Sequence, residues 1–575
     1  MSSALPAAES SVTRPGKLRR PPGTWARIRR ELRMLRSPWT ATAALLALVV
    51  SIPILVIVFN LFSDPGENWE HIRELTLPGY IKNTAILVGV VGLLALAIGV
   101  PSAWLVATCD FPGRKIFAWA LVLPLALPTY IAAYAYGDIL QAIIPLQVWI
   151  RTNWGVDAFI IAEAILRYGT VSLILASVLY PYVYLSSRAA FSVRAASSIE
   201  ASQTLGHSIG STFFRVALPM ARPAIIAGLS LVMMEVINDF GAVSFFGIPT
   251  ITVGIFRTWL ALGDPSGAVR MSAGVMVVVL VLLLAERLSR GRAGFSELGS
   301  RSNHQAARLR RLPKGRGILA CSFCMIPLLF GFLIPAGRLS IWASQSFAKF
   351  HFGDFQELLV TTLAIAVVGT ICVVAGALTL AYAERVSPTR LVAPLARFST
   401  LGYAVPGAVI AVGIMLPFGW LDNHPVAAIQ ERFGLERELV FSGTLVALGC
   451  AYLVRFLAVA HQPIRSGMEN LCGNLDSAAR LLGSSPTATL FKVNLPLLTG
   501  SFFAATILIF VDVLKELPLT LILRPFNFET LATKAYSLAS EGRLPECAVP
   551  SLLVVLVGII GLIPLNRLME GRRHV

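Results

Sequence analysis

Long apolar runs alternate with short polar segments along most of this chain of 575 residues. A helix that crosses the hydrocarbon core of a membrane needs about 20 mainly apolar residues, and the chain contains about twelve such runs. The pattern therefore predicts an all-α polytopic membrane protein. The predicted spans lie near residues 41–62, 84–108, 115–140, 162–185, 223–246, 268–288, 317–337, 358–383, 396–419, 439–460, 500–524 and 547–567.

One polar segment occurs twice among these runs. EASQTLGHSIGSTFFRVALPM, which begins at Glu200, follows the fourth run, and SAARLLGSSPTATLFKVNLPL, which begins at Ser477, follows the tenth. A unit of six spans returns the chain to the side where it began, so we expect two parallel six-helix repeats related by an axis along the membrane normal. An offset of 277 residues aligns Gly206 with Gly483, Thr84 with Thr361, Gly99 with Gly376, Arg188 with Arg465, Phe214 with Phe491, Glu235 with Asp512 and Asp239 with Glu516.

Composition agrees with this class, and charge predicts the orientation. The chain is 56% apolar and 14% charged, whereas a soluble domain carries roughly a quarter charged residues. The formal charge of +17 comes largely from nine basic residues between Arg14 and Arg36 and from a second cluster between Arg287 and Arg316. Basic residues concentrate in cytoplasmic loops, so we expect both termini in the cytoplasm and no nucleic-acid binding.

The repeats and the charge clusters predict the domain organisation. Each repeat is bounded by polar or basic residues, and the two repeats are joined by a basic linker. The predicted parts are a basic cytoplasmic segment 1–40, a first repeat 41–288, a cytoplasmic linker 289–316, a second repeat 317–567 and a cytoplasmic tail 568–575.

Each polar segment has the local signals of two short helices joined at a glycine. In the first copy Gly206 can end one helix, because glycine tolerates the left-handed conformation of a C-cap, and Ser208 can cap the next. In the second copy Gly483 takes the first role, while Ser485 and Pro486 supply an N-cap and a first helical position. Small residues, Ala201 and Ser202 in one copy and Ala478 and Ala479 in the other, would allow close approach by a partner. Pro219 and Pro496 are expected to interrupt each second helix before the chain re-enters the membrane.

The pattern Glu-Ala-Ala/Ser, three residues, Gly and a later Pro resembles the EAA loop of binding-protein-dependent ABC import permeases. Glu200, Ala201, Gly206 and Pro219 match it in the first half. In the second half Ala478, Ala479, Gly483 and Pro496 match, but Ser477 replaces the Glu, with Asp476 adjacent. The resemblance implies that each segment seats in a cleft of an ATPase subunit, with asymmetric coupling where the Glu is missing.

The resemblance covers almost the whole chain and implies the partners as well as the fold, which would be that of a type I ABC importer permease. The stretches LVLPLALPTYIAAYAYG, EVINDFGAVSFFGIPTITVGIFRTW and DVLKELPLTLILRP are most similar to ferric iron permeases that fuse two halves. Thiamine and phosphonate permeases share this organisation, so the substrate stays open. The implied partners are two ATP-binding cassette subunits, a periplasmic substrate-binding protein and the lipid of a bacterial inner membrane.

No motif for covalent chemistry is found in the chain. A P-loop needs Gly-x4-Gly-Lys-Ser/Thr to bind phosphates, and the sequence PGKLRR at Gly16 does not supply it. We therefore expect no enzyme activity, no catalytic residues, no stable metal site and no cofactor on this chain, with ATP and Mg²⁺ held by the partner ATPase. A proton-coupled secondary transporter of the six-plus-six type is the alternative from another class.

Ionisable residues within the predicted spans mark a candidate translocation path, because such groups are costly in a membrane and usually functional. Glu235, Asn238 and Asp239 follow the first polar segment, and Asp512, Lys515 and Glu516 follow the second. Residues four apart share a helix face, so both faces together could line a path for a hard, oxygen-preferring cation. The alternatives are structural ion pairs, such as Lys515 with Asp512, or a location at the outer interface. Tyr130 and Tyr134 are either oxygen donors on this path or interfacial aromatic residues.

Overall fold

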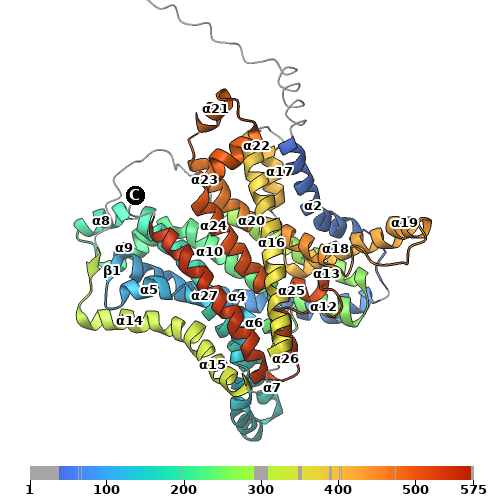
Figure 1. Ribbon diagram of the computed structural model, residues 1–575. Helices are drawn as coiled ribbons and strands as arrows, with labels where there is room; N and C mark the ends of the chain where they lie inside the picture. Colours follow the sequence, from blue (N-terminus) through green and yellow to red (C-terminus); the bar gives the residue numbers. More distant parts are fainter. Residues whose placement is uncertain are drawn as a thin grey trace, which may run out of the picture.

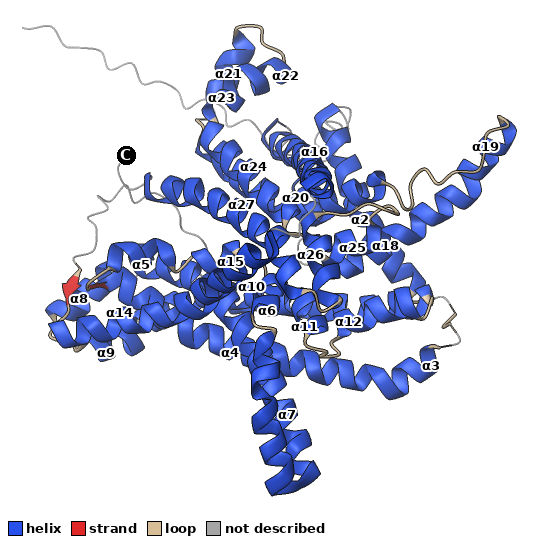
Figure 2. Ribbon diagram, turned by 60° about the horizontal axis from the view of Figure 1, so that its bottom comes forward, coloured by secondary structure: helices blue, strands red, loops and turns tan. Residues whose placement is uncertain are grey.

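The computed structural model describes residues 38–571 except 63, 67, 195, 291–308, 348–351, 387–391, 401, 403, 404 and 473. Most of the predicted basic segment 1–40, most of the linker and the last four residues of the tail therefore lie outside the described residues. The described part is helical almost throughout (Figures 1 and 2).

The α-helices of the first half are α2 (Pro38–Asn60), α3 (Trp69–His71), α4 (Leu77–Thr108), α5 (Arg114–Ala120), α6 (Thr129–Ala135), α7 (Asp138–Ala189), α8 (Ala196–Thr204), α9 (Ile209–Thr212), α10 (Leu218–Asn238), α11 (Gly241–Phe245), α12 (Ile251–Phe256) and α13 (Pro265–Arg290). Those of the second half are α14 (Lys314–Leu328), α15 (Ile334–Ser346), α16 (Phe352–Val386), α17 (Val392–Ser399), α18 (Gly407–Leu421), α19 (Ala427–Arg432), α20 (Leu445–Asn470), α21 (Asn474–Leu481), α22 (Pro486–Thr489), α23 (Leu495–Leu497), α24 (Thr499–Leu514), α25 (Pro518–Leu523), α26 (Leu531–Ser540) and α27 (Leu544–Gly571). Short π-helical turns are η1 (Ile72–Thr76), η3 (Ala190–Arg194), η4 (Phe213–Ala217), η5 (Arg257–Ala261), η6 (Leu329–Leu333), η9 (Asp422–Val426) and η10 (Leu490–Asn494), and η2 (Leu123–Ala126) is a 3₁₀ turn.

All twelve predicted spans are largely helical, but not all of them are single straight helices. Within the described residues nine helices are long and apolar enough to cross a membrane, or eleven if each of two bent pairs counts as one span. The segment predicted at 115–140 bends by 90° between η2 and α6, where Pro124 and Pro128 remove backbone donors. The segment predicted at 396–419 is divided between α17 and the 15-residue α18.

The first helix of each half packs against the other half, although α15, which continues from α14 and η6, packs against α27 of its own half. Helix α2 lies against α16, α17 and α18, whereas α14 and η6 lie against α4, α5 and α7 (Figure 1). Glycine permits both close approaches: a Cβ on Gly413 of α18 would lie 2.8 Å from Pro53 of α2, and one on Gly331 would overlap the Ser177 carbonyl of α7. Small residues at helix crossings let backbones approach in this way in membranes. The two repeats are therefore interleaved in space, although each is continuous in sequence.

A short pair of parallel strands attaches the end of the linker to the first half. Strand β1 (Cys109–Asp110) follows α4, and β2 (Arg310–Arg311) precedes α14. The Leu312 N–H also donates to the Asp110 carbonyl, at 3.1 Å. This contact holds the start of the second half beside the loop between α4 and α5.

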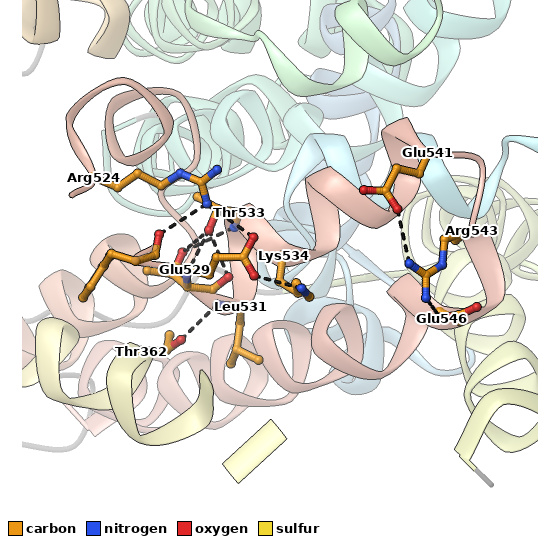
Figure 3. A network of polar contacts seen from close by, with 11 residues as sticks. Thr362, Arg524, Glu529, Leu531, Thr533, Lys534, Glu541, Arg543 and Glu546 are labelled. Carbon is orange, nitrogen blue, oxygen red and sulfur yellow. Dashed lines mark hydrogen bonds and ion pairs between the residues drawn. The ribbon is translucent and has the colours of Figure 1, made fainter. Parts of the chain in front are cut away.

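One repeated contact corrects the predicted alignment. The Thr84 hydroxyl accepts the Ile251 N–H at the start of α12, and the Thr362 hydroxyl accepts the Leu531 N–H at the start of α26 (Figure 3). Thr362, rather than Thr361, is thus the structural counterpart of Thr84, because the two halves differ by short insertions that an ungapped offset ignores.

Candidate functional site

The two polar segments form the first candidate region, and we call them the first glycine segment (residues 196–217) and the second glycine segment (residues 474–497). Both central glycines have φ +83°, the left-handed conformation that favours glycine. The Ser208 hydroxyl accepts the Ser211 N–H, and the Ser485 hydroxyl accepts the Ala488 N–H. The predicted helix–glycine–helix geometry and both serine caps are therefore present.

The small residues of the two segments do not all face outward. Ala201 and Ala478 are exposed, but Ser202 and Ala479 are buried against their own segments. The Ser202 and Thr212 hydroxyls lie 3.0 Å apart, joining the two short helices of the first segment. The expectation that both small residues of each pair face a partner is thus wrong for Ser202 and Ala479.

Exposed apolar side chains occupy matching positions in both segments, and the sequence analysis missed them. Leu205 is 78% exposed and its counterpart Leu482 is 86% exposed, while Phe214 and its counterpart Phe491 are also exposed. Exposed apolar patches bordered by polar residues mark interaction surfaces. The sequence signal was the recurrence of Leu and Phe at the 277-residue offset within otherwise polar segments.

The acidic position of the motif differs between the segments. The Glu200 side chain lies outside the described part of the structure, whereas Ser477 is exposed. Asp476 does not take the place of the missing Glu, because its carboxylate turns inward and lies 2.6 Å from the Arg385 Nε. The second segment therefore presents no carboxylate at its Glu position.

The two segments also join the membrane helices differently. The prolines were expected to interrupt both second helices, but in the first half Gly210–Asn238 forms one continuous helix through Pro219. The π-helical turn η4 (Phe213–Ala217) lies just before Pro219, and such a local change of the hydrogen-bond ladder lets a membrane helix accommodate a proline. In the second half Pro486–Leu497 and Thr499–Leu514 meet at a bend of 84°, two residues after Pro496.

A polar cavity between the halves is the second candidate region. Its volume is about 130 Å³, and every predicted path residue except Tyr134 lines it. We call it the polar cavity. Its polar lining residues are Thr129, Tyr130, Tyr182, Glu235, Asn238 and Asp239 from the first half and Arg455, Asp512, Lys515 and Glu516 from the second.

Asp239 and Glu516 line the cavity, but not as members of the predicted helix faces. Asp239 and Glu516 do not share a helix face with Glu235 and Asp512, because α10 ends at Asn238 and α24 ends at Leu514. Instead each carboxylate caps the short helix that follows: Asp239 accepts the N–H groups of Ala242 and Val243, and Glu516 accepts that of Leu519. A carboxylate is favourable at a helix N-terminus, so these acids also fix the backbone around the cavity.

Arg455 is the functional candidate that the sequence analysis missed. Its guanidinium lies 3.4 Å from the Glu516 carboxylate and 3.5 Å from the Asn238 amide oxygen, which also accepts the Gly407 N–H at 2.8 Å. Val178 occupies the corresponding place in the first half and also lines the cavity. A lone arginine in the apolar run AYLVRFLAVA was the available signal.

The remaining predicted residues divide between the cavity and the core. Lys515 pairs with Asp512 at 2.9 Å, the structural pair that had been weighed as an alternative. The Tyr130 hydroxyl donates to the Lys515 carbonyl across the halves. Tyr134 is fully buried beside Tyr130 and Phe245 and does not line the polar cavity. Within the described residues, no group of three His, Cys, Asp or Glu is arranged to hold a metal ion.

Interleaved helical halves, paired polar segments and a charged cavity between the halves define a membrane transport permease with two repeats. The chain belongs to the family of the binding-protein-dependent transport system inner membrane component, whose model matches residues 95–290 and 372–571. It is therefore a multi-span transport subunit of a system that depends on a binding protein.

Individual relatives cover different parts of the chain. The Fe(3+)-transport system permease protein FbpB 2 of Haemophilus influenzae is 24% identical over 83% of this chain and 87% of its own length. The probable sulfate transport system permease protein cysT of Nephroselmis olivacea is 33% identical over 35% of this chain and 68% of its own length. The molybdenum transport system permease protein ModB of Escherichia coli is 31% identical over 35% of this chain and 90% of its own length.

Proposed function

We propose that this chain is the permease of a bacterial ABC importer that passes ferric iron, delivered by a periplasmic binding protein, through the polar cavity. The main support is the presence of four carboxylates from both halves in one cavity, against two basic groups. A hard cation prefers oxygen ligands, and this excess of acids disfavours an oxyanion. The iron permease of Haemophilus influenzae aligns over 83% of this chain and thus with both halves.

A second cavity supports a route out of the polar cavity. It is mainly apolar, has a volume of about 250 Å³ and shares Leu125, Tyr182, Asp512 and Lys515 with the polar cavity. It is also lined by Leu185 and Val459, which lie about one helical turn nearer to the glycine segments than Tyr182 and Arg455. The cation would leave through this cavity toward the side that carries those segments.

In the proposed cycle the glycine segments bind two separate ATPase subunits, which hold ATP and Mg²⁺, on the cytoplasmic side. The exposed Leu205 and Leu482 supply apolar contact area, and the left-handed glycines fix the angle between the short helices. ATP binding draws the segments together and rearranges α10 and α24 around the cavity to accept the cation. Hydrolysis then reopens the inner side.

Proline substitution tests the ATPase contact. Proline fixes φ near −65°, so Gly206→Pro or Gly483→Pro cannot keep φ +83° and should abolish uptake while the protein still inserts. Gly434→Pro is the matched control, because Gly434 is also left-handed, at φ +66°, but lies in the loop after α19. ATPase association is measured by co-purification. Unchanged association and transport in both segment variants would refute the docking assignment.

The substrate is tested with proteoliposomes that contain the permease, its ATPase subunits and the binding protein. We expect ATP-dependent uptake of radioactive ferric iron, and reduced uptake after Glu235→Gln with unchanged ATPase association. Sulfate and molybdate are the oxyanion alternatives suggested by the relatives' names, and thiamine and phosphonate are the alternatives suggested by the fused organisation. Uptake of one of these without iron uptake would overturn the iron proposal, and uptake without any ATPase subunit would favour a secondary transporter.

A further inference from the structure

The two glycine segments are attached to the membrane helices by different chemistry. In the first half the attachment is aromatic: Trp104 at the end of α4 lies 5.2 Å, between ring centroids, from Phe213 of the segment and 5.4 Å from Phe191. In the second half it is polar and comes from the end of α16. These two helix ends are counterparts, because Thr84 on α4 and Thr362 on α16 make the same contact.

Arg385 is the centre of the polar attachment. Its Nε lies 2.6 Å from the Asp476 carboxylate, and its Nη1 donates to the Met468 carbonyl at 2.5 Å. The Arg385 and Asp476 side chains are only 13% and 17% exposed, so water screens this pair weakly. The guanidinium of Arg385 is a planar group with several donors, so this one side chain ties the end of α20 and the start of α21 to α16.

A second contact ties the second short helix of the segment to α16 as well. The Tyr382 hydroxyl donates to the Pro486 carbonyl at the start of α22, at 2.6 Å. Tyr382 and Arg385 lie one turn apart on α16, so both short helices of the second glycine segment are fixed to one helix. Glu384, between them, pairs with His461 of α20 at 3.0 Å.

Helix α16 connects this attachment to the cavity wall and to the far side of the bundle. A Cβ on Gly369 of α16 would lie 3.2 Å from Tyr452 and 3.5 Å from Val513, the residue that follows Asp512. At its other end Thr362 accepts the Leu531 N–H, next to the network of Arg524, Glu529 and Lys534 (Figure 3). Both contacts lie on this one unbroken helix of 35 residues.

The connection between each glycine segment and the membrane helix that follows it is continuous in the first half and bent in the second. The first glycine segment continues into α10, which carries Glu235 and Asn238, whereas the second meets α24 at a bend of 84°. A bend between two helices can absorb a displacement that a continuous helix transmits. The ion pair with α16 supplies the second half with another rigid connection.

We propose that Arg385 is a positioning residue that transmits the movement of the second glycine segment to the cavity through α16, so that the two ATPase contacts are not equivalent. The proposal rests on the proposed function of the segments as ATPase contacts. The first contact acts on the cavity through α10 directly, and the second acts through Arg385, Tyr382 and α16. Asp476 serves this connection rather than the contact with the ATPase.

The test uses the complete complex of permease, ATPase subunits and binding protein in lipid nanodiscs. Arg385→Ala and Asp476→Asn should leave co-purification of the ATPase subunits unchanged but lower the stimulation of ATP hydrolysis by loaded binding protein at least about fivefold, the low end of typical coupling between sites. Arg311→Ala, which removes an exposed pair with Asp110 that is also near the expected inner face, should leave the stimulation unchanged.

A charge exchange separates positioning from folding. Arg385→Asp combined with Asp476→Arg should recover part of the stimulation, because the ion pair returns while the hydrogen bond to Met468 does not. Unchanged stimulation in both single variants would overturn the proposal, and so would loss of ATPase co-purification in them, since the pair would then only build the contact surface. Failure of the wild-type chain to bind the ATPase subunits would instead refute the proposed function.

Discussion

Arg455→Met should destabilise the protein strongly, because it leaves a buried carboxylate without its cation. Arg455 and Glu516 lie 3.4 Å apart with side chains 10% and 6% exposed. At an effective dielectric constant of about 20 their gross attraction is about 5 kcal/mol, and removing one partner of a buried pair typically costs about 3–5 kcal/mol. We expect a loss of that size in the free energy of unfolding.

The double variant Arg455→Met with Glu516→Gln should recover most of this loss. Glutamine keeps an oxygen that can accept the Leu519 N–H, and a neutral pair avoids burying two charges. The assay is equilibrium unfolding in mixed micelles of increasing sodium dodecyl sulfate content, monitored by circular dichroism. Arg73→Met is the control, because Arg73 forms an exposed pair with Glu70 that should contribute only about 0–1 kcal/mol.

A double-mutant cycle decides the outcome. We expect a coupling energy of at least about 2 kcal/mol between positions 455 and 516. Single-variant losses that add to within about 0.5 kcal/mol, or a loss below about 1 kcal/mol for Arg455→Met, would refute the view that these charges depend on each other.

Two further predictions concern helix packing and the hydrogen bonds of Asp422. Gly228→Ala should lower the free energy of unfolding by about 1–3 kcal/mol, because the new Cβ would lie 2.8 Å from the Tyr182 carbonyl of α7. Gly274→Ala is the control and should be neutral, because a Cβ there meets open space. Equal losses for the two variants in the same micelle assay would contradict this prediction. Asp422 lies beyond the end of α18, where burial alone would raise its pKa but hydrogen bonds from the Ser442 hydroxyl and the N–H groups of residues 440–442 hold the pKa below its usual value. The stability it contributes is therefore present above about pH 4 and lost as the pH falls through the folded pKa. The protection factors of the amides of residues 440–442, which correct for the intrinsic pH dependence of exchange, should therefore fall in acid for the wild type and lose this pH dependence in Asp422→Asn.

Local patterns predicted the glycine segments well, because their geometry depends on residues a few positions apart. Gly206 and Gly483 adopt the expected left-handed conformation, and Ser485 caps its helix as predicted. The prediction of two equally interrupted helices was wrong, because Pro219 is accommodated within a continuous helix after the π-helical turn η4, and only the surrounding packing decides whether the chain bends.

The sequence predicted most of the charged residues that line the cavity but not how they are arranged around it. Glu235 and Asp512 lie on the predicted helices, yet Asp239 and Glu516 reach the cavity only because α10 and α24 end just before them. Arg455 arrives from α20, more than 200 residues from Asn238 in sequence. No periodicity within one span could reveal that contact.

The sequence by itself determined that this protein is a polytopic membrane protein with two repeats, because apolar length, basic clusters and glycine-centred turns are properties of short stretches, while the permease class came from its resemblance to a known family. The tertiary structure alone decided that α2 and α14 exchange places between the halves. It also decided that carboxylates from both halves meet at one cavity and that Arg385 ties only the second glycine segment to α16. These features depend on contacts between distant residues, whose energies are set by the packing of whole helices and not by the pattern along any one of them.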